Sequence, residues 1–378
     1  MDALTTPLPK DWEVKTFRDI STINQGLQIP ISQRLKAPTE HAKFYITIQA
    51  LNNRKEFEYI KTYNESVVCH KDDILMTRTG NTGMVITNIE GVFHNNFFKI
   101  NFDRTLINKD FLVYFLSLEQ TQKTILRKAG TSTIPDLNHN DFYSLLIPLP
   151  PLNEQIAIAN ILSNLDHYLY SLDSLILKKE SVKKALSFEL LSQRKRLKDF
   201  NQAWQRVRLG DICEITTGSL DANEMVHYGK YRFYTCAKEY YFIDKYAFDT
   251  EAILISGNGA YVGYVHYYKG KFNAYQRTYV LDNFSEHIIF VKYFLTMFLQ
   301  SHIQTNRNEG NTPYIVMATL KDFEILLPPL NEQIAIANIL SDLDNEIISL
   351  KNKKRQFENI KKALNHDLMS AKIRVLNK

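Results

Sequence analysis

Apolar residues recur every three or four positions in two long stretches of this 378-residue chain. That spacing is typical of a coiled-coil seam. Each stretch follows a proline pair, and proline suits the first turn of a helix but not its interior. We therefore predict two unbroken helices, at 150–197 and 328–376. The seam residues are Ile158, Leu162, Leu165, Leu169, Leu172, Ile176, Val182, Leu186 and Leu190 in the first stretch, and Ile336, Leu340, Leu343, Ile347, Leu350, Phe357, Ile360, Leu364 and Leu368 in the second.

The two stretches are copies of one another. Both begin with the fourteen residues PPLNEQIAIANILS, at 150–163 and 178 residues later at 328–341. A weaker repeat precedes each copy, because Trp12 and Asp19-Ile20 reappear as Trp204 and Asp211-Ile212. Between these anchors the sequences diverge. The chain is therefore an internal repeat in which a constant frame encloses a variable segment, twice.

The repeat also predicts how the two long helices pack. At 1.5 Å per residue, 40 residues extend about 60 Å, and neither helix could bury its seam alone. The end of the first helix leads into the second variable segment, and the end of that segment leads into the second helix. We therefore expect an antiparallel coiled-coil pair with a pseudo-two-fold axis, and one variable domain at each end.

The variable segments, residues 1–149 and 198–327, have a mixed pattern. Short β-branched and aromatic runs bounded by Gly, Asn and Asp predict strands. Late in each segment, 111–118 and 288–299 have helical spacing. We predict an α+β fold, meaning two mixed α/β domains separated by the two long helices. The strand-like runs are Phe44 to Ile48, Val67 to Cys69, Ile74 to Met76, Ile253 to Ser256 and Tyr261 to Tyr267.

The composition of the chain does little to narrow its function. A net charge of +5 is compatible with nucleic-acid binding but modest for 44 kDa. The three cysteines, Cys69, Cys213 and Cys236, form no C-x-x-C pair and predict neither a disulfide framework nor a zinc cluster. The first ten residues lack the order of a signal peptide, and no run of 18 apolar residues occurs. We expect a cytoplasmic protein with no membrane partner.

Catalytic motifs are not apparent in the sequence. An adenine methyltransferase would need an Asp/Asn-Pro-Pro-Tyr/Phe motif, which Thr312-Pro313-Tyr314 does not match, and a glycine-rich turn for its methyl donor. The glycines between Gly257 and Gly263 have the wrong spacing for a dinucleotide or phosphate loop and are more typical of a turn beside a strand. No acidic set typical of a nuclease is recognisable. We predict no catalytic, cofactor or metal site in this chain.

DNA contact is the better supported chemistry. Arginine suits guanine, and asparagine or glutamine suits adenine, in the major groove. Such residues gather around glycine turns in both variable segments, although Asn and Gly also simply make turns. Basic residues at the end of the first long helix could meet phosphates, or could only be solvated. The candidates are Thr77, Arg78, Thr79, Asn81, Asn95 and Asn96 in the first segment, Asn258, Tyr261, Gln276 and Arg277 in the second, and Arg194 and Arg196.

Together these motifs resemble type I restriction-modification specificity subunits, across essentially the whole chain. The resemblance rests on the twin PPLNEQIAIANIL motifs and on the Trp and Asp-Ile that open each variable segment. Asp73-Ile74-Leu75 with Arg78-Thr79-Gly80, and the stretch from Gly130 to Pro135, resemble the family's first domain. The second domain departs from it, with Gly310 to Tyr314 in that place and no Arg-Thr before Gly259.

The resemblance implies a non-catalytic subunit with two target-recognition domains, each reading one half of a bipartite DNA sequence. It implies as partners two methyltransferase subunits that use S-adenosylmethionine, and two ATP-dependent nuclease or translocase subunits that require Mg²⁺. The helices would set the spacer and dock the methyltransferase. The alternatives are a coiled-coil scaffold that joins two protein-binding modules and an autonomous fused restriction enzyme, which the lack of methyltransferase motifs disfavours.

Overall fold

The computed structural model of the protein describes residues 8–52, 57–305 and 313–375. The chain forms two compact units. Unit 1 combines Met1–Leu172 with Lys353–Lys378, and unit 2 is the continuous segment Asp173–Asn352. Within the described ranges, no helix is both long enough and apolar enough to cross a membrane.

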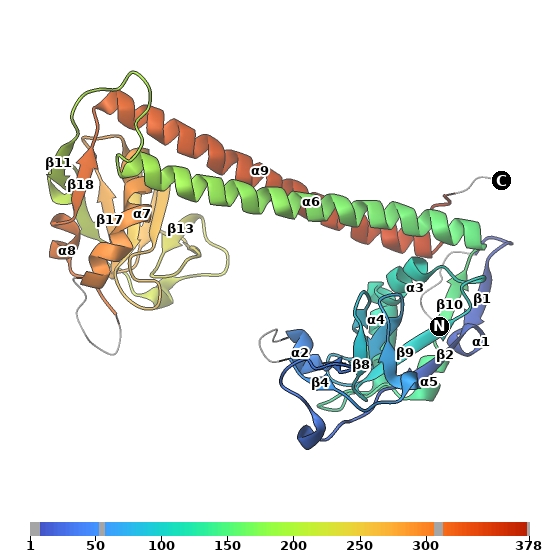
Figure 1. The fold of residues 1–378 in the computed structure, drawn as a ribbon. Coiled ribbons are helices and arrows are strands. Elements are labelled where there is room, and N and C mark those ends of the chain that lie inside the picture. The colour runs from blue at the N-terminus through green and yellow to red at the C-terminus, as the bar shows by residue number, and fades with distance from the viewer. Residues whose placement is uncertain (1–7, 53–56, 306–312, 376–378) are drawn as a thin grey trace. The chain divides into compact units, whose positions relative to one another are not determined.

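Two 40-residue helices, α6 (Leu152–Leu191) and α9 (Leu330–Met369), contribute to both units (Figure 1). Each begins directly after its proline pair, two residues later than predicted, and each ends before the predicted end at 197 or 376. In unit 1 the first half of α6 packs against the last half of α9, and the rings of Tyr168 and Phe357 lie 4.7 Å apart. In unit 2 the other halves pair, with Lys179 bound to Glu346 at 2.8 Å. The pairing is antiparallel in each unit, which confirms this part of the fold prediction.

The predicted seam is correct except at one equivalent position in each helix. Val182 and Ile360 are 45% and 49% exposed. A full heptad after Ile176 falls on Lys183, not on Val182, and Lys183 pairs across the helices with Asp344. The seam therefore continues through an ion pair at this level, and the neighbouring apolar residue turns toward solvent.

The remaining elements of unit 1 form small sheets covered by short helices. The strands are β1 (Glu13–Thr16), β2 (Ser21–Gln25), β3 (Lys43–Ile46), β4 (Tyr59–Ile60), β5 (Val68–Cys69), β6 (Ile74–Thr77), β7 (Val85–Ile86), β8 (Gly91–Phe93), β9 (Phe97–Phe102) and β10 (Leu146–Leu149), and the helices are α1 (Phe17–Ile20), α2 (Ile48–Asn52), α3 (Lys109–Leu116), α4 (Glu119–Ala129) and α5 (His139–Tyr143).

Unit 2 gathers most of its strands into one sheet. Its strands are β11 (Gln205–Arg208), β12 (Glu214–Thr217), β13 (Tyr231–Tyr234), β14 (Tyr241–Ile243), β15 (Phe248–Ser256), β16 (Val265–Ala274), β17 (Thr278–Asp282) and β18 (Glu324–Leu327), and its shorter helices are α7 (Ile288–Thr305) and α8 (Met317–Lys321).

The two units share a topological frame. An antiparallel pair, β1 with β10 and β11 with β18, lies before each long helix, and the order β2-β9-β6 in unit 1 matches β12-β17-β15 in unit 2. Strands β6 and the end of β15 are buried, as their continuous apolar runs predict. Beyond this frame the units differ, since unit 1 has two four-stranded sheets and unit 2 has one six-stranded sheet. The α+β fold and the internal repeat are thus confirmed.

Glu332 of the repeated motif anchors unit 2. Its carboxylate is fully buried and accepts hydrogen bonds from Trp204 Nε1 at 3.2 Å and from Arg196 Nη2 at 2.6 Å. A buried carboxylate needs such partners, because losing its hydration is otherwise costly. Arg196 therefore ties the segment after α6 to the first turn of α9.

Glu154 makes the same junction in unit 1. Its buried carboxylate accepts from Trp12 Nε1 at 3.1 Å and from Arg374 Nε at 2.7 Å. Arg374 also donates to Asp11 at 2.9 Å. The segment after α9 thus completes unit 1, as the segment after α6 completes unit 2.

The glutamine that follows each of these glutamates is also buried and structural. Each donates to the carbonyl of its own motif's first proline, at 2.9 and 2.8 Å. Each side-chain oxygen accepts a backbone N–H near the start of another helix, from Asn108 to Gln155 at 2.9 Å and from His287 to Gln333 at 3.0 Å. The two buried polar residues of the repeated motif are thus explained by contacts that fix where α6 and α9 begin.

A tyrosine, an aspartate and a lysine connect the helix pair to each domain. In unit 2, Tyr293 donates to Asp344 at 2.6 Å and Lys183 pairs with the same carboxylate. Burial and the neighbouring carboxylate raise the pKa of Tyr293, so it stays a hydrogen-bond donor. Unit 1 repeats the arrangement with Tyr114, Asp166 and Lys361.

Candidate nucleic-acid interface

The loop between β6 and β7 of unit 1, residues 77–84, carries four of the predicted contact residues. The backbone N–H of Gly83 donates to the Thr77 carbonyl at 2.8 Å, and the buried Thr77 hydroxyl donates to the Asn81 carbonyl at 2.5 Å. Gly80 and Asn81 have φ of 67° and 58°. Glycine and asparagine adopt this left-handed conformation most readily. The loop is therefore held in one shape by its own hydrogen bonds.

Arg78 directly follows β6 at the start of this loop. Its Nε and Nη2 donate to the two carboxylate oxygens of Asp136, at 2.9 and 2.6 Å, and its guanidinium carbon lies 5.6 Å from the centre of the Phe98 ring. The Arg78 backbone N–H donates to the Asn96 carbonyl at 2.8 Å. The structure thus brings the loop together with the turn that contains Asn95 and Asn96.

The corresponding loop of unit 2, residues 256–264, joins β15 to β16. Gly263 N–H donates to the Ser256 carbonyl at 2.7 Å, and Gly257 N–H donates to the Arg277 carbonyl at 2.8 Å. The strand predicted at Tyr261 to Tyr267 is wrong at its start, because residues 261–263 form the turn and β16 begins at Val265. The positive φ of Gly259 and Gly263 produces this turn.

The predicted residues of unit 2 gather around this loop. Arg277 touches it through its carbonyl, Gln276 precedes Arg277 in the same turn, and Asn258 forms an isolated β-bridge with Tyr314. Tyr261 is 43% exposed, and the ammonium of Lys238 lies 5.3 Å from the centre of its ring. Of the stretch from Gly310 to Tyr314, residues 310–312 lie outside the described part of the chain.

A glutamine side chain braces each loop, at neighbouring positions of the turn, but the two loops present different side chains. Gln122 of α4 donates to the Gly83 carbonyl at 2.8 Å, and Gln300 of α7 donates to the Val262 carbonyl at 2.7 Å. The position of Arg78 is occupied by Gly257 in unit 2, where a Cβ would lie 2.3 Å from the Arg277 carbonyl oxygen. Unit 2 therefore cannot hold an arginine there, and base contacts cannot transfer position by position.

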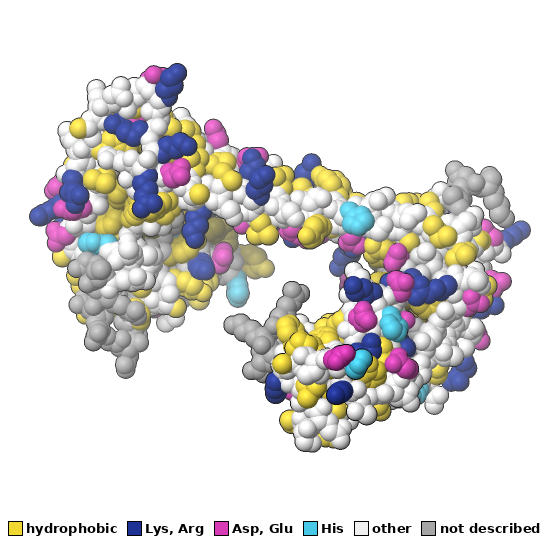
Figure 2. All heavy atoms as spheres, in the orientation of Figure 1, with side chains coloured by type: hydrophobic (Ala, Val, Ile, Leu, Met, Phe, Trp, Pro, Cys, Tyr) yellow, Lys and Arg dark blue, Asp and Glu magenta, His cyan; other side chains and the backbone are white. Residues whose placement is uncertain are grey.

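Arg194 and Arg196 lie after the end of α6 and not on the loop. Arg194 packs its guanidinium over the Phe188 ring, 4.7 Å from the ring centre. Arg196 is engaged with buried Glu332, and this pairing argues against a phosphate contact. On the face shown in Figure 2, Lys and Arg side chains of each unit are interspersed with Asp and Glu. The loops, more than overall charge, are therefore the candidate interface.

Sequence reasoning missed Asp136 and Lys238. Asp136 lies 58 residues from Arg78 along the chain, and nothing in the intervening sequence signals their pairing. Lys238 is one of many lysines, and only the folded chain places it over Tyr261.

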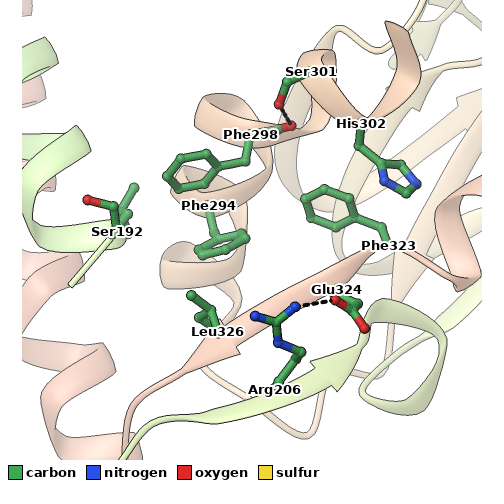
Figure 3. A pocket seen from close by; sticks show the side chains of 10 residues that line it. Ser192, Arg206, Phe294, Phe298, Ser301, His302, Phe323, Glu324 and Leu326 are labelled. Atoms are coloured by element: carbon green, nitrogen blue, oxygen red, sulfur yellow. Dashed lines mark hydrogen bonds and ion pairs between the residues drawn. The ribbon is translucent and has the colours of Figure 1, made fainter. Parts of the chain in front are cut away.

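Unit 2 also contains a pocket of about 470 Å³, between the end of α6, α7 and β18. Figure 3 shows the Phe294, Phe298 and Phe323 rings in its wall, and Arg206 paired with Glu324 at 2.7 Å. The His302 ring lies edge-on to Phe323. The wall of the pocket combines these rings with Leu191, Leu326 and polar side chains. In the part of the chain that the structure describes, no three His, Cys, Asp or Glu side chains are grouped as metal ligands.

Comparison with known proteins supports an interface with DNA. A family model described as the type I restriction modification DNA specificity domain matches residues 9–179 and 201–359. The type I restriction enzyme EcoDI specificity subunit of Escherichia coli is 40% identical over 162 residues, which are 42% of this chain and 35% of that protein. The MjaVIII specificity subunit of Methanocaldococcus jannaschii is 24% identical over 98% of this chain and 95% of its own.

Two solved structures have the same fold. The S subunit of a type I restriction-modification system from M. genitalium superposes with a TM-score of 0.66 at 19% identity, over 97% of this chain and 98% of that one. The HsdS subunit of Thermoanaerobacter tengcongensis gives a TM-score of 0.50 at 18% identity, over 99% and 100%. At these identities the likeness concerns the fold alone.

Proposed function

Because the chain belongs to the type I restriction modification DNA specificity family, we propose that it reads a bipartite double-stranded DNA target, one half with each unit. It is a specificity subunit and not a catalytic one. One observation carries the proposal. The two loops join corresponding strand pairs of the two units, and each is braced by a glutamine, Gln122 or Gln300, yet they present different side chains. Two loops with the same framework but different side chains are what we expect if each loop recognises a different half of the target.

The chemistry of the loops fits base reading. Arg78 and Arg277 provide donors for guanine, and Asn81, Asn258 and Gln276 provide the amide pattern that suits adenine. Phosphate contacts position a protein on DNA without specifying sequence, so these side chains are the ones that would select a target.

Exchanging residues 204–327 for the same segment of a relative with another target should change only one half of the recognised sequence. The frame that holds unit 1 is untouched by the exchange, so the other half should be kept. Methylation mapping with the complete complex measures both halves at once. A change in both halves would contradict the modular reading, and no sequence preference in the unexchanged complex would contradict the proposed function itself.

We propose further that α6 and α9 dock two copies of one methyltransferase subunit. The buried identities of the repeated motif are explained by its contacts, but some exposed positions are identical as well. Asn153, Ile156 and Asn160 lie on one exposed face of α6, and Asn331, Ile334 and Asn338 repeat it on α9. Farther along, many exposed positions differ, as with Tyr170 and Ile348, although exposed Ser171, Lys184 and Ala185 recur as Ser349, Lys362 and Ala363. The fold does not require these exposed residues to be identical. Their repetition is expected if the same partner binds to both helices.

Replacing Ile156 and Ile334 with aspartate should remove this docking, because each would place a charge at an apolar contact of the interface. Loss of a central contact typically costs at least 2 kcal/mol, or about thirtyfold in affinity. Each single variant should bind one methyltransferase and the double variant none, as counted by native mass spectrometry. The matched control is Tyr170→Asp with Ile348→Asp, which should still bind two. Equal loss in the control would refute this face.

The remaining chemistry belongs to partners in this proposal. S-adenosylmethionine would be bound by the methyltransferase, and ATP with Mg²⁺ by two nuclease or translocase subunits. The purified chain alone should therefore neither methylate nor cleave DNA, and it should become part of an active complex when the methyltransferase is added.

A further inference from the structure

We infer that Asp136 positions Arg78 to read a guanine in one half of the target, by a device that unit 2 cannot contain. The inference rests on the proposed function of the loops. Asp136 would not touch DNA in this role. It would act through the arginine that it orients.

The ion pair with Asp136 leaves several donors of Arg78 unused. A guanidinium has five N–H donors in a rigid, planar fork. The Nε–H and one Nη2–H are directed at Asp136. Both N–H bonds of Nη1 and the second N–H of Nη2 remain at the far end of the fork. Guanine presents two neighbouring acceptors in the major groove, N7 and O6, which this end of the fork can meet with two parallel hydrogen bonds.

The ion pair between Arg78 and Asp136 is not needed to attach the loop to the rest of unit 1. The loop is already attached to the 135–137 segment by other bonds: Leu137 N–H donates to the Arg78 carbonyl at 2.9 Å, and the Thr82 hydroxyl donates to the Pro135 carbonyl at 2.7 Å. Thr79 and Asp136 also form a β-bridge. With these bonds in place, the loop does not depend on the Arg78–Asp136 ion pair for its attachment. The clear effect of the pair is to restrict the side chain of Arg78 to one orientation.

Asp136 also affects the local charge around Arg78. Asp136 neutralises Arg78 locally, which weakens its attraction to any phosphate while leaving the directed donors in place. A fixed, locally neutral fork favours a base edge over the backbone, because phosphate binding depends mainly on net positive charge. Without Asp136, Arg78 would therefore contact the DNA backbone regardless of sequence and would no longer select one base.

Unit 2 cannot use the same device. Gly257 occupies the arginine position and Tyr314 occupies the place of Asp136 in the equivalent bridge. A Cβ at Gly257 would lie 2.3 Å from a carbonyl oxygen, so this position cannot hold an arginine. In our proposal, unit 2 therefore reads its half-site with other side chains of the loop.

The test uses the complete chain in complex with its methyltransferase. Binding is measured to the mapped target and to every single base-pair substitution of it, at several salt concentrations. Arg78→Ala should reduce the preference for one G·C pair by about 5- to 150-fold and leave the preference at the other positions. Arg78→Lys should lose the same preference, since an ammonium has no fork, with the salt dependence unchanged.

Asp136→Ala should lose the preference at that same base pair, while its salt dependence becomes steeper by about one phosphate contact. The double variant should have the base preference of Arg78→Ala and not a lower one. The matched control is the exposed pair Arg206 and Glu324 of unit 2, whose replacement by alanine should change neither profile.

The inference is overturned if Asp136→Ala keeps the full preference at that pair, or if either variant loses affinity equally at every position. Melting temperatures measured in parallel establish that each variant is folded under the conditions of the binding assay. A wild-type complex without any sequence preference would instead overturn the proposed function, so the two failures are distinguishable.

Discussion

Replacing Glu332 with alanine should lower the free energy of unfolding of unit 2 by about 3 to 5 kcal/mol, the usual cost of removing one partner of a buried ion pair. The Glu332 carboxylate is fully buried and holds both Arg196 and the indole N–H of Trp204. Its loss leaves two donors without an acceptor at the point where α9 begins. Chemical denaturation followed by circular dichroism measures the effect.

The control for Glu332 is another glutamate of the same helix. Glu346 pairs with Lys179, but both side chains are partly exposed, at 45% and 30%. Exposed pairs contribute about 0 to 1 kcal/mol. Glu346→Ala should therefore have little effect, and equal losses in the two variants would show that burial does not govern the junction.

Inserting four residues after Ser174 and four after Asn352 should lengthen the spacer of the DNA target by about one or two base pairs. Four residues add about 6 Å of helix and nearly preserve the phase of a coiled-coil seam, and each base-pair step is about 3.4 Å. The two positions are equivalent in the repeat, and each long helix passes from one unit into the other near them. Methylation mapping should find the same two halves with the original spacing no longer modified.

The single insertion after Ser174 is the informative control. It shifts Lys179 and Lys183 by about one turn relative to their partners on α9, while the pair of Lys361 with Asp166 keeps its place. The helix pair would lose its register, so we expect reduced stability and no new, defined spacing. An unchanged spacer in the matched insertion, with full activity, would refute a role for the helices in spacing.

Much of the architecture could be predicted from sequence because it is periodic or repeated. The seam spacing and the proline pairs predicted the long helices, and the fourteen identical residues predicted two equivalent units. The repeat did not reveal why those residues are identical. In the sequence, Glu154 and Gln155 look like ordinary polar residues of a helix. Their partners Trp12, Arg374 and Asn108 are distant in sequence, so only the structure shows that they are buried and bonded.

The candidate site was predictable in place but not in detail. Glycine turns with nearby Arg and Asn identified the two loops, since local turn chemistry is written in adjacent residues. What each side chain does depends on partners elsewhere in the chain. Asp136 gives Arg78 an orientation, and Glu332 gives Arg196 a structural role. The start of β16 was misplaced because the aromatic run through Tyr261 favours a strand and Gly263 interrupts it.

The junction at Arg374 has a consequence for the order in which the protein is completed during synthesis. Unit 2 is continuous, so all of its residues have been made once the chain has reached Asn352. Unit 1 lacks Leu368 and Met369 of its core, and the arginine for Glu154, until synthesis has passed unit 2. Domains usually fold in the order in which they emerge from the ribosome. Here the domain that begins first is finished last, and a chain ended shortly after Asn352 and released from the ribosome should contain a folded unit 2 beside a protease-sensitive unit 1.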